Sequence, residues 1–122
     1  MAGREISSLR YPWIRNELVG HLRELATPNP RPTWKADIQA GLNAGIDEVI
    51  HFFFDDHDFD EGDIGVVLSN QQEVELVGDL KRSLNSLVNV LPQGNDDEYV
   101  SHPDWPSVTR AASRALEGLQ AA

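Results

Sequence analysis

The longest helical pattern in the chain lies between Ser69 and Leu91, in the sequence SNQQEVELVGDLKRSLNSLVNVL. Its leucines recur every three or four residues, the spacing of one face of an α-helix: Leu76, Leu80, Leu84, Leu87 and Leu91. Ser69 and Gln72 match a capping box at the start, and Pro92 and Gly94 end the pattern. The stripe is too short for a convincing coiled coil, so it predicts a helix packed into a core.

Three further segments carry helical periodicity. Residues 11–26 (YPWIRNELVGHLRELA) place isoleucine and leucine on one face and Arg15 on the polar side. Residues 33–45 (TWKADIQAGLNAG) have three large apolar residues on one face: Trp34, Ile38 and Leu42. Residues 104–120 (DWPSVTRAASRALEGLQ) turn small residues towards the core, which would let this helix approach its neighbour closely.

Residues 46–56 (IDEVIHFFFDD) fit two structures. A helix would place most of their apolar residues on one broad face, whereas a strand would pair with residues 64–68 (IGVVL) in a hairpin at about 49–68. A lone hairpin is marginally stable and the rest of the chain offers no third strand, so we favour the helix. We therefore predict an all-α, compact single-domain bundle of four main helices, with an α+β fold containing the hairpin as the alternative.

The length of 122 residues suits one domain, with residues 1–10 expected as a flexible N-terminal arm. Twenty acidic residues against ten Lys and Arg give a net charge of −10, which disfavours nucleic acid and anionic membranes and favours a basic protein partner. There is no cysteine, no apolar run of membrane-spanning length and no signal peptide pattern at the start. We expect a cytoplasmic protein, and the sequence leaves its oligomeric state open.

The sequence HFFFDDHDFDEGD, residues 51–63, is the most unusual stretch and is called the acidic segment below. It resembles a calcium-binding loop if that loop begins at Asp56, but the expected glycine and final glutamate positions hold Glu61 and Val67. We therefore predict no metal and no cofactor. The rival hypothesis is a small metal-assisted enzyme that uses His51 with the Asp55–Asp56 pair.

No phosphate-binding loop, nucleophile elbow or zinc-protease motif is present, so we expect no catalytic activity. A second alternative is a structural domain that oligomerises through its leucine stripe. The preferred hypothesis is a protein-binding module, in which carboxylates steer and hold a basic surface while exposed aromatics such as Phe52 and Phe59 anchor it. The alternative is a negatively charged loop with no partner, in which Phe59 packs into the core. The predicted protein-binding residues are Asp55, Asp56, Asp58, Phe59, Asp60, Glu61 and Asp63.

Two resemblances accompany these patterns. The strings RYPWIRNELVGHLREL, HFFFDD, IGVVL and HPDWPSVTRAASRALEGL resemble a small uncharacterised bacterial family across nearly the whole chain, most specifically at YPW and HPDWP. That resemblance implies one compact domain and no assigned activity.

Residues 50–92, an aromatic–acidic segment followed by an amphipathic leucine helix, are similar to immunity proteins of contact-dependent growth inhibition systems. That resemblance implies a small, acidic, helical protein that binds the toxin domain of a rival cell and blocks it. Many such toxins are nucleases with basic active sites. The extra N-terminal helix and the tryptophan corners depart from that pattern, so no individual contact residue is carried over.

Overall fold

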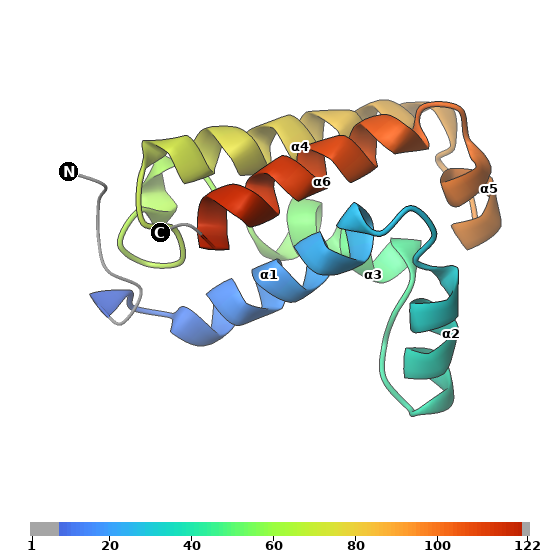
Figure 1. The fold of residues 1–122 in the computed structure, drawn as a ribbon, viewed down its shortest axis with the longest axis horizontal. Helices are drawn as coiled ribbons and strands as arrows, with labels where there is room; N and C mark the ends of the chain where they lie inside the picture. Colours follow the sequence, from blue (N-terminus) through green and yellow to red (C-terminus); the bar gives the residue numbers. More distant parts are fainter. Residues whose placement is uncertain (1–7, 121–122) are drawn as a thin grey trace.

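A computed structural model describes residues 8–120, and within this range the chain forms six α-helices and no extended strand (Figure 1). The helices are α1 (Pro12–Ala26), α2 (Arg31–Gln39), α3 (Ile46–Ile50), α4 (Gln71–Val90), α5 (Asp96–Ser101) and α6 (Trp105–Gln120). A π-helical stretch, η2 (His51–Asp56), continues α3, and a 3₁₀ turn, η3 (Glu61–Asp63), precedes α4. The all-α class is confirmed, but the prediction of four main helices is wrong because α3 and α5 add two short ones.

The hairpin at residues 49–68 is not formed. Residues 46–56 are helical throughout, and Ile64 makes one isolated bridge to Leu68 within the same short loop. A helix satisfies its own backbone groups locally, whereas a strand here would have lacked neighbouring strands.

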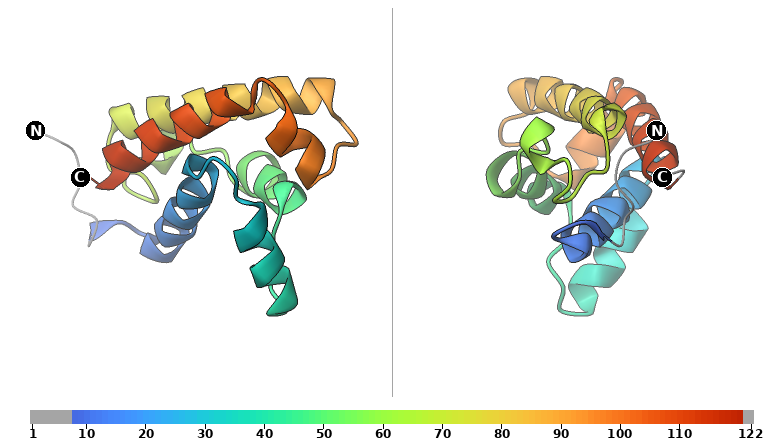
Figure 2. Two further views of the ribbon diagram at one scale, coloured as in Figure 1. Left: turned by 45° about the vertical axis from the view of Figure 1, so that its right-hand side comes forward. Right: turned by 90° about the vertical axis from the view of Figure 1, so that its left-hand side faces the viewer.

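Helices α4 and α6 run side by side, and α1 crosses beneath α6 (Figures 1 and 2). From the predicted leucine stripe, Leu80, Leu84 and Leu87 are fully buried within the chain, while Leu76 and Leu91 are partly exposed. The small residues of α6 are buried against these leucines and allow the close approach expected: Ala111, Ala112 and Ala115. Among the helices of residues 8–120, none combines the length and hydrophobicity that a membrane crossing requires.

Arg15 was predicted on the polar face of α1, but the structure buries it: only 2% of the residue is exposed. Its guanidinium donates two parallel hydrogen bonds to the carboxylate of Glu73 on α4, at 2.8 and 2.9 Å, and further ones to the carbonyls of Val67 and Leu119. The backbone N–H of Ser69 donates to the same carboxylate at 2.7 Å. This buried ion pair joins α1, α4, the end of α6 and the loop before α4.

The start of α4 also differs from the predicted capping box of Ser69 and Gln72. The helix begins at Gln71, and Asn70 is its N-cap, with its side-chain oxygen accepting the N–H of Glu73 at 3.0 Å. Residues 1–7 of the predicted flexible arm lie outside the described residues. Of the remainder, Leu9 is buried and the Arg10 N–H donates to the carbonyl of Gly65.

Candidate functional site

The acidic segment is fastened to the core by its aromatic rings. Phe52, Phe53 and Phe59 are all buried, with ring centroids 5.2 to 5.9 Å apart. The prediction that Phe52 and Phe59 are exposed anchors is therefore wrong. For Phe52 the reason is local, because it lies in a π-helix with i→i+5 hydrogen bonds. This geometry changes the angle between successive side chains, so an assignment of helix faces with 3.6 residues per turn puts Phe52 on the wrong side.

Phe59 is buried for a different reason. Its backbone takes φ of 54°, a left-handed conformation that is rare for a bulky residue. This conformation returns the ring to the core, where it packs against Phe52, Phe53 and the ring of His57. The packing offsets the backbone strain and fixes the path of the acidic residues on either side.

The six predicted acidic residues are placed in different ways. Asp55, Asp56, Asp58, Asp60 and Glu61 are exposed, and Asp63 is half-buried. The Asp55 carboxylate pairs with His51 Nδ1 at 2.6 Å, and Asp60 accepts the N–H of Gly62 as the N-cap of η3. Residues 8–120 hold no group of three or more side chains placed to bind a metal ion.

A groove of about 430 Å³ along α4, called the α4 groove, brings part of this set together. Its carboxylates are those of Asp58, Asp60, Glu61 and Glu75. Glu75 was not predicted, because it lies on the polar face of α4, and nothing local to the sequence places that face beside the acidic segment. The groove also contains Lys81 and Arg82: Lys81 Nζ donates to the main-chain carbonyl of Asp58, itself a groove residue, at 2.7 Å, and Arg82 pairs with Asp79.

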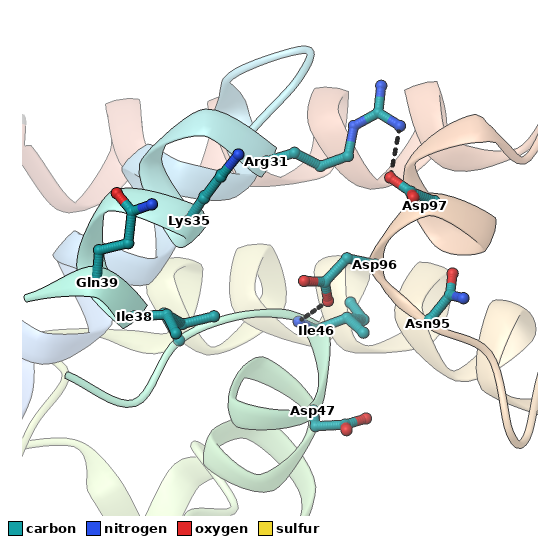
Figure 3. Close-up of a pocket in the computed structure, with 10 residues that line it drawn as sticks. Arg31, Lys35, Ile38, Gln39, Ile46, Asp47, Asn95, Asp96 and Asp97 are labelled. Carbon is teal, nitrogen blue, oxygen red and sulfur yellow. Dashed lines mark hydrogen bonds and ion pairs between the residues drawn. The ribbon is translucent and has the colours of Figure 1, made fainter. Parts of the chain in front are cut away.

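A larger cleft of about 730 Å³, the α2–α5 cleft, lies at the other end of the molecule (Figure 3). Arg31 and Lys35 project from α2 on one side, and Asp96 and Asp97 come from α5 on the other. Arg31 and Asp97 form an ion pair of 2.9 Å across it. Asp96 accepts the N–H of Ile46 at 2.8 Å, which ties α5 to the start of α3.

Asp47 adds a further acid to the wall of the α2–α5 cleft. Burial, and then the negative charge of Asp47, raise the pKa of the nearby Tyr99 phenol. The sequence signal for this wall is the Asn95-x-x-Glu98 pattern between the helical segments 69–91 and 104–120: it is a complete capping box that starts α5 and presents Asp96 and Asp97 in its first turn.

A third hollow of about 480 Å³, the α1–α3 cleft, lies where the loop after α2 passes α1. Its acids are Glu17, Glu24 and Glu48, and Leu42 lies on its wall. Glu24 Oε1 accepts the indole N–H of Trp34 at 3.2 Å and lies 3.5 Å from His21 Nδ1. The cleft is therefore strongly acidic with an apolar edge.

The three apolar residues predicted to share one face of residues 33–45 are not buried alike. Trp34 is 1% exposed, but Ile38 is 53% and Leu42 59% exposed. Helix α2 projects from the body in all views and ends at Gln39, before the predicted end at residue 45, so Ile38 lies near its far end and Leu42 in the turn beyond it (Figures 1 and 2). The name α2 stripe is used below for Trp34, Ile38 and Leu42.

Comparison with known proteins gives one family. Residues 9–122 match the family described as Domain of unknown function (DUF7945), and the chain belongs to this family. The match agrees with the expected whole-chain membership of a small uncharacterised family. No curated protein matches the chain, and no solved structure does.

Proposed function

We propose that the protein is a binding module for a basic protein and acts by occlusion, covering a positively charged surface of its partner. The acidic segment and the α4 groove form the contact. Asp55, Asp56, Asp58, Asp60, Glu61 and Asp63 steer and hold the partner, while Phe59 fixes the segment from inside instead of touching the partner.

The observation that carries this proposal is the convergence of Asp58, Asp60 and Glu61 with Glu75 in one groove. Lys81 and Arg82 lie in the same groove, but their recorded partners are the main-chain carbonyl of Asp58 and the carboxylate of Asp79, not the four groove carboxylates. The backbone that carries the acids is held by buried rings, so little conformational entropy is lost when a partner binds. Charges arranged in this way raise the association rate and select partners of opposite sign.

The partner class we propose is a toxin domain, with this chain as its immunity protein in the cytoplasm. The similarity of residues 50–92 to immunity proteins of contact-dependent growth inhibition supports this, as does the net charge of −10. A negatively charged face that covers the basic active site of a nuclease would exclude its nucleic acid substrate, since that substrate is held mainly through its phosphates.

The test searches the genes adjacent to this one for a secreted protein with a basic domain, and measures that domain by calorimetric titration and by rescue of growth on co-expression; the absence of such a gene would count against the toxin partner. The variant Asp56→Asn/Asp58→Asn/Glu75→Gln removes three acids of the proposed face. The matched control, Glu98→Gln/Asp104→Asn/Glu117→Gln, removes three exposed acids from α5, α6 and the turn between them and changes net charge equally.

We expect the first variant to weaken binding by about tenfold or more and the control to weaken it by no more than about twofold. Wild-type affinity should also fall steeply between about 50 and 500 mM salt, as the Debye length shortens. Equal losses in the two variants, or an affinity that salt does not change, would refute this binding face.

A further inference from the structure

We infer that the exposed end of the α2 stripe is a second docking surface, and that its occupant is a segment of a basic protein with an apolar side chain flanked by lysine or arginine. This inference rests on the proposed function for the basic character of the partner. It adds a contact surface at the opposite end of the molecule from the α4 groove.

The apolar part of the surface is Ile38 and Leu42, each more than half exposed. Gly41, with φ of 86°, turns the chain after α2, and the N–H of Leu42 donates back to the carbonyl of Asp37 at 2.9 Å. This turn holds the backbone of Leu42 in place just beyond α2, a helix that projects from the body (Figure 2). Ile38 at the end of α2 and Leu42 in the turn after it therefore offer a partner two exposed aliphatic side chains on one projecting arm.

The charges around the arm define the partner. Leu42 lies on the wall of the α1–α3 cleft with Glu17, Glu24 and Glu48. Ile38 lies on the wall of the α2–α5 cleft, where the acids are Asp47, Asp96 and Asp97. The loop between the two clefts contributes Asn43 to one and Ala44 to the other, so the arm separates two acidic hollows.

The cations near the arm do not balance these acids. Arg31 is already paired with Asp97, which leaves Lys35 against the remaining five carboxylates. An apolar centre with a charged, accessible rim is the usual composition of a protein interface. The sign of this rim selects a partner rich in lysine or arginine. A second copy of the chain would bring its own copy of the same acids to the contact, and facing like charges disfavour that arrangement.

The probe is a peptide of about 14 residues with leucine at helical spacing and lysine at the other positions, long enough for about four turns. A matched peptide carries glutamate in place of every lysine. Binding to the full chain is followed by backbone amide shifts in NMR and by titration. We expect the lysine peptide to shift Ile38, Leu42 and Asn43, and the glutamate peptide to shift none of them.

Substitution then isolates the apolar contact. Ile38→Ser/Leu42→Ser should weaken the lysine peptide by roughly tenfold or more, since a partner would cover two aliphatic side chains. Val90→Ser, which changes an equally exposed residue (61%) on α4, is the control and should leave the affinity unchanged. All substituted positions are exposed, so amide spectra of the free variants should remain those of the folded chain.

Three results would overturn the inference: no binding of the lysine peptide, shifts confined to residues 55–61, or equal affinity for wild type and Ile38→Ser/Leu42→Ser. Sedimentation that shows a dimer abolished by the same double variant would also overturn it, because the occupant would then be a second copy. The proposed function is tested separately by the variant at Asp56, Asp58 and Glu75, so the failure of one does not conceal the failure of the other.

Discussion

Replacing Glu73 by glutamine should destabilise the protein strongly, because it removes one partner of a buried ion pair. Arg15 and Glu73 are 2% and 1% exposed, and their side chains meet through two hydrogen bonds of 2.8 and 2.9 Å. The glutamine amide would turn one N–H donor towards the guanidinium and leave the positive charge unpaired in the core. Breaking one side of such a pair costs about 3–5 kcal/mol, a large part of the total of about 5–15 kcal/mol for a domain.

The Arg15–Glu73 pair should also make the free energy of unfolding depend on pH. Burial alone raises the pKa of Glu73, but hydrogen bonds from Arg15 and the Ser69 N–H, with the charge of Arg15, outweigh burial and lower it overall. The folded carboxyl is thus more acidic than in the unfolded chain, where its pKa is about 4.3. Its contribution to the free energy of unfolding is complete above that value and is lost as pH falls through the lower folded pKa. Glu73→Gln should lack this part of the acid sensitivity.

The assay is urea unfolding followed by circular dichroism, applied to a double-mutant cycle. The single variants of the cycle are Arg15→Met and Glu73→Met. Arg15→Met/Glu73→Met places apolar side chains at both positions and leaves neither charge unpaired, so it should be more stable than either of them. It should remain below wild type, since the Val67 and Leu119 carbonyls lose their donor at about 1 kcal/mol each.

Asp97→Asn provides the control, because it breaks the exposed Arg31–Asp97 pair and should cost less than about 1 kcal/mol. A cost for Glu73→Gln as small as that of Asp97→Asn would refute the reasoning. A loss of unfolding free energy in Arg15→Met/Glu73→Met equal to the sum of the losses in the two single variants would refute it as well.

Three other substitutions test the fold. Phe59→Ala should lower the free energy of unfolding by about 3–5 kcal/mol, because the ring is buried in the phenylalanine cluster; a loss under about 1 kcal/mol in urea unfolding would place that ring outside the core. Asn95→Ala should cost about 1 kcal/mol in the same assay by removing the cap of α5, and amide exchange should accelerate between residues 96 and 101 without change in α6. Gly94→Ala should lower the melting temperature, since a methyl group there would lie 2.7 Å from the Tyr99 ring; an unchanged melting temperature would show that the ring moves freely.

The candidate site was predicted in composition but not in arrangement. The sequence located the exposed acids at residues 55–61 because charged side chains rarely enter a core. It preferred an exposed Phe59 over a core position without deciding between them, since nothing local indicates that one residue in a left-handed conformation will return its ring to the core. Glu75 and the two clefts beside α2 were missed, because each depends on segments that are distant in the sequence.

The sequence by itself determined the helices α1, α4 and α6 and the all-α class, because apolar periodicity and capping residues act over a few neighbouring positions. The tertiary structure alone decided which faces meet. It buried Arg15, which the sequence pattern places on a polar face, by supplying Glu73 from 58 residues away, and it left Ile38 and Leu42 exposed although the same kind of pattern places them on the face of Trp34. The periodicity of a sequence predicts that one face of a helix is apolar. Whether that face is buried depends on whether another part of the chain, or another protein, lies against it.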